Sequence, residues 1–313
     1  MQRFKNVLFV TEGSKGEMAA LQHLAEDIQA VRGKLTIIDV VLDAPISLST
    51  PETASSLVQL QKTIVKEREA ALKEMVSRLR KLLPNLKVAS LVRQGTDYIE
   101  IIRQVQAGAH DLVAKVSGST SRIEGMLFGT LDMNLLRKCP CPVLILKGHK
   151  KIKASKVLAA VDLVRHEPGR ANLDSTVIDL AASIARKAEG SLDILHAWFV
   201  GYQKQIKAAE KSRSMKTVEA LLKDVRESAR VHMETMAADY ADLSPGMHLI
   251  KGKPEDVIPR FAKNHGTHLV VMGTVGRTGI AGFFIGNTAE KILQGLNCSV
   301  LAVKPEGFKC PVE

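Results

Sequence analysis

Residues 273–288 carry the groups in this chain that are best suited to holding an anion. Five glycines fall in the stretch: Gly273, Gly276, Gly279, Gly282 and Gly286. Glycine permits positive φ angles and lets another group approach the backbone closely. Arg277 adds a positive charge, and Thr274, Thr278 and Thr288 add hydroxyls. Because free backbone N–H groups attract anions, the pattern predicts a site for a phosphate or a similar group.

A helix is expected to follow this loop directly. Asn287 is a favoured N-cap residue, and Glu290 stands three positions later, as in a capping box. Ile292, Leu293 and Leu296 would give the helix an apolar face. The loop is neither a Walker loop nor a dinucleotide fingerprint, because it lacks Gly-Lys-Ser/Thr and comes late in its unit. Glycine spacing alone also fits a structural loop that allows tight helix packing, so both interpretations stay open at this point.

Other residues that could do chemistry indicate packing instead. Cys139 and Cys141 lack the spacing and the second pair of a zinc site, and we expect them to be small buried hydrophobes. Cys310 is expected to be exposed, and His265 and His268 to lie in a turn. No nucleophile recurs with a histidine and a carboxylate in both halves of the chain. We therefore predict no catalytic residue, no metal site and a protein that is not an enzyme.

Composition indicates a globular chain of about two domains. It has 313 residues, of which 45% are apolar and 4% aromatic. No apolar run reaches the ~18 residues that would span a membrane. The first residues resemble a strand more than a signal peptide, and four cysteines form no disulfide framework, so we expect a cytoplasmic location. The net charge of +11 is spread evenly and lacks stacking aromatics, which disfavours nucleic acid as a partner and is compatible with a small anion.

An internal repeat divides the chain into two copies of one unit. A shift of 157 residues aligns 110–147 with 267–304 without a gap, and ten of the 38 positions are identical. Near the start of each copy the shift is 150 residues, which pairs 6–12 with 156–162. Such self-similarity is typical of a duplicated domain.

Each copy is expected to alternate strands and helices. Continuous apolar runs such as residues 7–10 are typical of strands buried on both faces of a parallel sheet. Long helices are predicted over residues 53–83 and 203–240, either as ordinary amphipathic helices or as a lid or partner surface. The alternation predicts an α/β fold with two tandem five-stranded parallel sheets, in domains 1–150 and 151–313.

Ligands of such sheets bind beyond the carboxyl ends of the strands. In the second copy this edge would bring together Asp162 after the first strand, the turn at Gly252 and the glycine loop. His196, in the second strand, aligns with Asp39 of the first copy. Both are candidates for lining the cleft of their own copy.

The pattern Gly273-x2-Gly276-x9-Gly286, followed by a helix and the strand CSVLAVK, resembles the universal stress protein family. The resemblance covers almost the whole chain twice and implies a Rossmann-like, adenine nucleotide alpha hydrolase-like fold in tandem. Many members of that family bind ATP, so it implies an adenine or ribose contact from the acid after the first strand and a glycine loop around the phosphates. Asn287 stands where the family usually has Ser or Thr. The expected nucleotide-binding residues are Asp162, Gly252, Gly273, Thr274, Gly276, Arg277, Gly286, Asn287 and Thr288.

The first copy departs from this pattern. Val116 and Ser119 replace the first two glycines, and a β-branched valine resists positive φ. Gly129 remains, and Lys115 and Arg122 would still attract an anion. We expect the first copy to lack a complete phosphate cradle and to serve as a structural partner or to hold a different ligand.

Three functions stay open from the sequence. The first is a stress-response protein that binds ATP or another adenine nucleotide in the second copy, with Mg²⁺ only beside the nucleotide, and acts through an unknown protein partner. The second is a binding module for a non-nucleotide anionic or amphiphilic small molecule. The third is a weak ATPase, since slow hydrolysis needs only a positioned water.

The resemblance also implies an arrangement of the two copies. Family members commonly dimerise through the last strand of the sheet. The strands at 141–147 and 298–304 are therefore expected to pair within one chain, as an internal pseudo-dimer that leaves further homo-oligomers open. Such pairing would cover an otherwise open sheet edge.

Overall fold

The computed structural model describes residues 4–14, 16–43, 51–117, 128–148, 155–163, 170–198, 215–274 and 286–312. The first copy contains β1 (Asn6–Val10), α1 (Glu17–Ala30), β2 (Lys34–Val41), α2 (Pro51–Leu82), β3 (Lys87–Gln94), α3 (Asp97–Ala107), β4 (Leu112–Val116), α4 (Thr130–Lys138) and β5 (Val143–Leu146). The second copy contains β6 (Lys156–Val161), α5 (Arg170–Lys187), β7 (Ser191–Trp198), α7 (Met215–Ala238), the 3₁₀ turn η2 (Ala241–Leu243), β8 (Gly246–Lys251), α8 (Pro254–His265), β9 (Leu269–Gly273), α9 (Asn287–Gly295) and β10 (Ser299–Val303). The domain boundary predicted after residue 150 lies outside the described residues.

The strands of the described residues form one sheet in the order β3-β2-β1-β4-β5-β10-β9-β6-β7-β8. Neighbouring strands within each copy are parallel. The copies join where β5 and β10 run antiparallel, with Leu144 opposite Leu301. The predicted α/β fold is confirmed, and the two last strands pair within the chain as expected.

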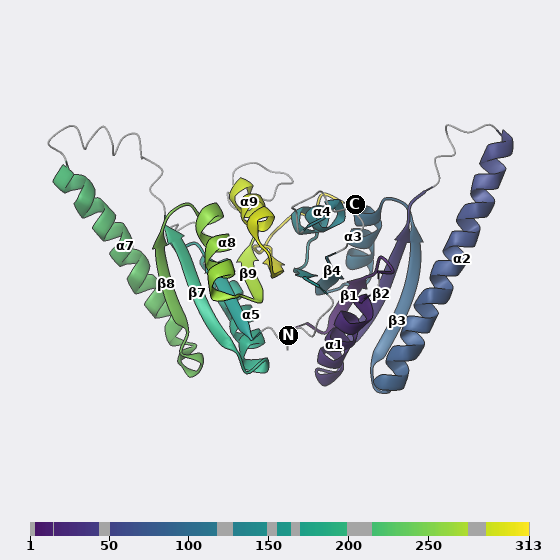
Figure 1. Ribbon diagram of the computed structural model, residues 1–313, viewed down its shortest axis with the longest axis horizontal. Coiled ribbons are helices and arrows are strands. Elements are labelled where there is room, and N and C mark those ends of the chain that lie inside the picture. Colours follow the sequence, from purple (N-terminus) through teal and green to yellow (C-terminus); the bar gives the residue numbers. More distant parts are fainter. Residues whose placement is uncertain are drawn as a thin grey trace.

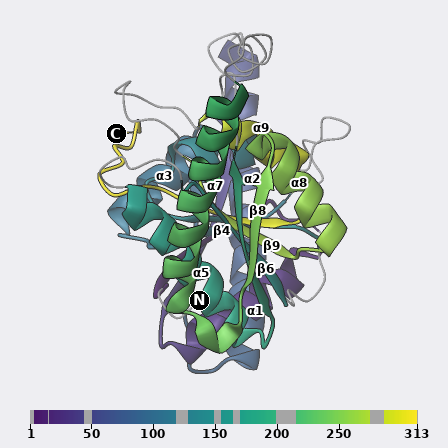
Figure 2. The ribbon, with the colours of Figure 1, turned by 90° about the vertical axis from the view of Figure 1, so that its left-hand side faces the viewer.

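Helices cover both faces of this sheet, because successive side chains of a strand point to opposite faces. In β1, Val7 and Phe9 join the apolar cluster beneath α1 and α2, whereas Leu8 and Val10 join the cluster beneath α3 and α4. The second copy repeats this division with α5 and α7 on one face and α8 and α9 on the other. Figure 1 shows the copies side by side, with α2 and α7 on the outer flanks and α4 and α9 near the middle, and Figure 2 views the molecule end-on from the α7 side.

The two long helices are amphipathic, as predicted. In α2 the buried residues Leu72, Val76 and Leu79 recur at helical spacing, while most of their neighbours are exposed. In α7, Ala229 and Met233 take the positions that align with Leu72 and Val76. The part of the predicted second helix before residue 215 lies outside the described residues.

Two aligned lysines tie each copy to the other. Lys304, directly after β10, donates from Nζ to the carbonyl oxygens of Leu136 at 2.6 Å and Arg137 at 3.1 Å, near the end of α4. Lys147, after β5, donates in the same way to Asn297, which follows α9. A cation is favoured at a helix C-terminus because the helix dipole is negative there. The reciprocal contacts give the junction an approximate two-fold symmetry.

None of the helices in the described parts of the chain is long and apolar enough to cross a membrane.

Candidate functional site

The predicted site of the second copy lies at the carboxyl ends of β6 and β9, as expected from the fold. Asp162 follows β6 directly and is half-buried. Its backbone N–H donates to Asp174 Oδ1 of α5 at 3.1 Å. The first copy repeats this bond at 3.3 Å between the N–H of Glu12 and Glu17 Oε1 of α1. Each copy therefore holds the turn after its first strand with a carboxylate from the helix that follows.

Gly252 has a backbone role that both copies share. Its φ is 150°, and a Cβ at this position would lie 2.7 Å from Val257 Cγ2. Gly95, its counterpart in the first copy, has a φ of 136°. Because L-residues rarely adopt this conformation, glycine is needed in both turns. The backbone conformation alone explains why residue 252 is a glycine. The predicted contact of Gly252 with a nucleotide stays a prediction.

The glycine loop is closed at its base by hydrogen bonds. Thr274 follows β9 and is fully buried. Its N–H donates to the carbonyl of Val303 at 3.1 Å, and its own carbonyl accepts the N–H of Gly286 at 2.9 Å. The chain thus leaves and returns at one point beside β10. Gly276 and Arg277 lie between these ends, outside the described residues, so their predicted roles stay predictions.

The hydroxyl of Thr274 is engaged inside the protein. Its Oγ1 accepts from Lys304 Nζ at 2.8 Å, and Lys304 is the lysine that also reaches α4 of the first copy. Burial lowers the pKa of Lys304 to about 8. The base of the loop is therefore connected to the first copy through one buried ammonium group.

Helix α9 begins one residue earlier than its sequence predicts. Gly286 is the N-cap, in an extended conformation, and Asn287 is the first helical residue, so the predicted capping role of Asn287 is wrong. The bond from the Gly286 N–H to Thr274 fixes the helix start at the loop's closing point. Glu290 then stands too far along for a capping box and pairs instead with Arg137 of α4. Asn287 and Thr288 are left exposed at the helix N-terminus.

Gly273 allows close packing between β9 and α5. A Cβ at this position would lie 2.8 Å from Leu173 Cδ2. The glycine therefore fits the structural interpretation, in which a side chain is excluded by a neighbouring helix, as well as the ligand interpretation.

His196 lies buried at the end of β7 with an unsatisfied ring nitrogen. Its Nδ1 is 3.0 Å from the carbonyl oxygen of Val161 and 3.3 Å from the backbone N of Leu163. Its Nε2 has no hydrogen-bond partner among the described residues. Burial lowers the pKa of His196. The nearby charge of Asp162 raises the same pKa, but by less. The imidazole is therefore held neutral beside the predicted ligand edge.

The same edge of the first copy is filled by an ionic cluster. Lys115 is 2% exposed and places Nζ 2.9 Å from Glu12 Oε2 and 3.0 Å from Asp132 Oδ1. Burial alone would lower the pKa of Lys115, but the two carboxylates outweigh it and raise that pKa. Asp132 Oδ2 also accepts the N–H of Gly129 at 3.0 Å, at the start of α4. A carboxylate of the chain itself thus occupies the helix N-terminus where an external anion would bind.

The second copy has no such group at the matching positions. Met272 aligns with Lys115, and Ala289 aligns with Asp132. Both side chains are buried and apolar. The start of α9 therefore lacks the internal ammonium–carboxylate pair that fills the start of α4.

Helix α2 also reaches over the cleft of the first copy. Arg68 Nη1 lies 3.5 Å from Oδ2 of the buried Asp39. Burial raises the pKa of Asp39, and Arg68 partly opposes this effect. Sequence reasoning proposed Asp39 as a lining residue but missed Arg68, Glu17 and Asp132. Only Asp132 had a usable signal, since it stands three residues after Gly129 as a capping carboxylate would.

The described contacts of the cysteines and of His265 are packing contacts. Cys139 and Cys141 are buried, with their sulfurs 3.6 Å apart, as expected for small hydrophobes. Cys310 was expected to be exposed, but it is half-buried and lies 3.4 Å from the carbonyl of Lys138. His265 ends α8 and stacks on Phe261. Within the described ranges, no three His, Cys, Asp or Glu side chains are placed to hold a metal ion.

Comparison with known proteins agrees with the duplicated fold. The model of the universal stress protein family matches residues 3–147 and again 154–304. The chain belongs to the universal stress protein family. It is 27% identical to universal stress protein E of Escherichia coli K12 over 315 residues, which cover 100% of this chain and 98% of that protein. The universal stress protein E homolog of Haemophilus influenzae is 24% identical, with 97% and 98% covered. A putative universal stress protein from Pseudomonas aeruginosa UCBPP-PA14 superimposes with a TM-score of 0.70 at 25% identity, over 97% of this chain and 95% of that one.

Proposed function

We propose that this stress-response protein binds ATP or another adenine nucleotide in its second copy, while the first copy is a structural partner without a nucleotide. The contrast between the two helix starts carries this proposal. At α4 a buried lysine and aspartate form an ion pair, whereas at α9 the matching residues are Met272 and Ala289. An anion entering the second cleft would meet a helix N-terminus that no carboxylate of this kind has filled.

The surroundings of α9 support the same conclusion. The exposed residues Asn287 and Thr288 stand in the first helical turn, at the end of the helix where a bound anion would be favoured. Asp162 lies at the end of a strand two positions away in the sheet from β10, on the same carboxyl edge as β9. A universal stress protein has been solved in complex with cAMP, so the family includes a member that binds an adenine nucleotide.

We further propose that the protein acts in the cytoplasm by binding and by contact with a protein partner, and not by catalysis. The buried His196 contacts backbone atoms, and His248 pairs with Asp193 at 2.8 Å on β8 and β7, where the sequence offers no nucleophile that recurs in both copies. Mg²⁺ would enter only with the nucleotide, whose phosphates would supply most of its oxygen ligands.

Release of bound small molecules from the purified full-length chain tests the proposal. We expect heat denaturation to release adenine nucleotide at about one per chain, and calorimetry on the stripped protein to show one site that binds ATP more tightly than inorganic tripolyphosphate. Gly276→Val should abolish that site, because a β-branched residue obstructs a glycine loop. Ser119→Val, the same change at the aligned position of the first copy, is the matched control and should leave ATP binding unchanged.

Each alternative function has its own outcome in this experiment. Release of a different anionic or amphiphilic molecule, with no ATP binding by the stripped protein, would establish the non-nucleotide binding module. Phosphate release from ATP that falls with Asp162→Ala or Arg277→Ala would establish the weak ATPase. ATP affinity that is identical in the wild type and in Gly276→Val would exclude the glycine loop as the site.

A further inference from the structure

A groove with a positive lining lies at one outer edge of the sheet, far along the strand order from the junction of the copies. It runs between the last turns of α2 and the terminal strand β3 and has a volume of about 500 Å³. Helix α2 contributes three cations, Lys73, Arg80 and Lys81, and one hydroxyl, Ser77. Strand β3 contributes a second hydroxyl, Ser90. None of the lining residues is acidic.

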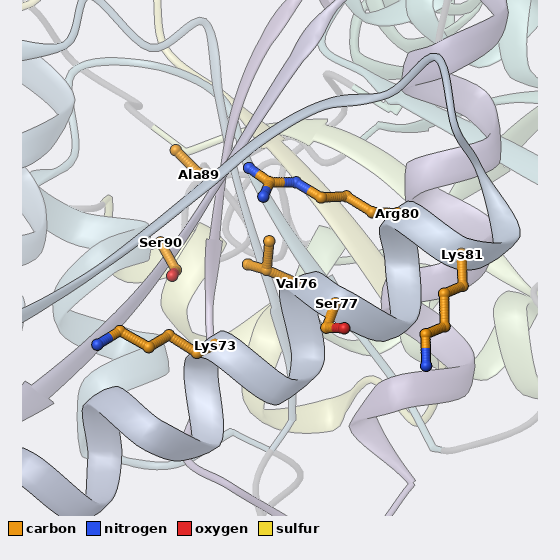
Figure 3. A pocket seen from close by; sticks show the side chains of 7 residues that line it. All are labelled: Lys73, Val76, Ser77, Arg80, Lys81, Ala89 and Ser90. Atoms are coloured by element: carbon orange, nitrogen blue, oxygen red, sulfur yellow. The ribbon is translucent and has the colours of Figure 1, made fainter.

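Two of the cations approach the groove from different ends. Figure 3 shows Arg80 extending across toward Ala89 and Lys73 extending sideways below Ser90, whereas the Lys81 amine is turned the other way. Seven residues separate Lys73 from Arg80, so their backbones lie about 10 Å apart along the helix. Arg80 Nη2 also donates to the carbonyl of Val88 at 3.1 Å, which fixes the guanidinium against the strand. This bond uses one of the five N–H donors of the group.

The charge of this groove is not balanced by neighbouring acids. Arg78, on the same helix but outside the groove, pairs with Glu74 at 3.2 Å. Neither Lys73 nor Arg80 forms an ion pair with a carboxylate in the parts of the chain described here. A concave surface lined by one sign of charge concentrates counter-ions.

The second copy shows that the fold does not require these cations. Strand register places Ala89 of β3 and Gly246 of β8 in matching positions, and the same shift of 157 pairs α2 with α7. There Ala237 replaces Arg80, and Glu234 replaces Ser77. Arg230, which replaces Lys73, is paired with Glu227 and Glu234. Within the described residues of this chain, the positive lining is therefore found in the first copy and not at the matching positions of the second.

We propose that this groove binds the phosphate chain of a small molecule. A guanidinium, an ammonium and two hydroxyls are the groups that proteins use to hold phosphate oxygens. The volume falls in the range of small-molecule sites. Val76 and Ala89 give the groove an apolar floor on which the rest of the ligand can rest. A peptide strand is a poorer occupant, because Arg80 already covers the carbonyl of Val88 at the sheet edge.

Calorimetry with inorganic tripolyphosphate at low salt tests this inference. The full chain is used in a Gly276→Val background, so that the glycine loop of the second copy adds no phosphate site of its own. We expect saturable binding of about one tripolyphosphate per chain, weakened by added salt. Lys73→Ala combined with Arg80→Ala should raise the Kd at least tenfold. Arg78→Ala also removes a cation from α2 but lies outside the groove, and it should change the Kd less than twofold.

Comparison of probes identifies the source of the phosphate. Equal affinity for ATP and tripolyphosphate in this background would assign recognition to the phosphate chain alone and would support the groove. Tighter binding of ATP that is lost in Lys73→Ala with Arg80→Ala would also support the groove, but it would overturn the proposal that the first copy holds no nucleotide. Absence of saturable binding, an equal loss in Arg78→Ala, or tighter binding of a hexaglutamate peptide would overturn it. The thermal midpoint of each variant shows that it is folded. Gly276→Val is designed to block the ATP site proposed for the glycine loop. Binding at the α2–β3 groove is therefore measured separately from binding at that site.

Discussion

Lys115 Nζ lies 3.0 Å from Asp132 Oδ1, and both side chains are almost completely buried. In the second copy the same two positions hold Met272 and Ala289. The same fold therefore has a buried ion pair beside the start of α4 and an apolar pair beside the start of α9. In the first copy the carboxylate of Asp132 also accepts the N–H of Gly129. The chain's own carboxylate therefore occupies the start of α4.

Replacing Lys115 and Asp132 by the residues of the second copy, Met and Ala, should show that the two positions are strongly coupled in the free energy of unfolding. Asp132→Ala leaves Lys115 buried with only Glu12, and Lys115→Met leaves Asp132 without its cation, so we expect each single change to cost about 3 kcal/mol. The double variant removes both charges and should recover most of that loss, since apolar replacement of a buried pair is often neutral. Urea denaturation of the four proteins measures the coupling. Additive losses would contradict it.

Arg68 is expected to stabilise the first copy chiefly by facing Asp39. Burial raises the pKa of Asp39, so the folded state holds a proton more tightly than the unfolded state, and stability falls as pH rises through that window. Arg68→Ala should raise this pKa further and cost about 1–2 kcal/mol at neutral pH, less than for a fully buried pair because Arg68 is partly exposed.

The loss in Arg68→Ala should be smaller at about pH 4 than at about pH 7, because the raised pKa of Asp39 favours its neutral form at the lower pH. Denaturation at both pH values measures it. Arg78→Ala, which breaks an exposed pair on the same helix, should cost less than about 0.5 kcal/mol at either pH. An unchanged loss in Arg68→Ala at low pH would show that its aliphatic packing matters and not its charge.

Sequence reasoning predicted those parts of the molecule that repeat and failed where the copies diverge. The alternation of apolar runs and helical periods was sufficient for the parallel sheets. The pairing of β5 with β10 followed from the family resemblance, which implies dimerisation through the last strand, applied to the aligned strands CPVLILK and CSVLAVK. The predicted capping role of Asn287 was wrong because a hydrogen bond from Gly286 to Thr274 fixes the helix start. Helix-capping preferences consider only neighbouring residues and cannot predict that bond. The Lys115 cluster was missed for a similar reason, since Glu12 and Lys115 are 103 residues apart.

Lys304 should make the stability of the protein depend on pH in the alkaline range. Burial lowers its pKa from the ordinary lysine value of about 10.5 to about 8, so between these values the unfolded state binds more protons and stability rises with pH. The rise attributable to this group is at most about 1.4 kcal/mol for each pH unit in the window. Lys304→Met should lose this part of the pH dependence.

Lys147→Met is the control for Lys304, because Lys147 is its aligned counterpart after β5 and is exposed. Denaturation of the wild type and both variants from about pH 7 to about pH 10 gives the comparison. A Lys304→Met curve parallel to that of the wild type would show that the contacts to Leu136 and Thr274 hold the ammonium charged throughout.

His196 should be neutral in the folded protein, with its proton on Nδ1. Burial lowers its pKa. The carbonyl oxygen of Val161, 3.0 Å from Nδ1, would accept from an Nδ1–H, whereas the backbone N–H of Leu163, 3.3 Å away, would donate to a bare Nδ1. The shorter contact assigns the proton to Nδ1 and leaves Nε2 as an acceptor. Because the folded state resists protonation, stability should be present above the unfolded pKa of about 6.5 and be lost as pH falls below it. His196→Asn keeps a donor near Val161 and lacks a group that titrates in this range, so its stability should fall less steeply between about pH 7 and about pH 5. His268→Asn, at an exposed histidine, should keep the slope of the wild type. Nitrogen NMR of the imidazole reports the tautomer directly, and a protonated Nε2 at neutral pH would reverse the assignment and make His196 a hydrogen-bond donor toward the cleft.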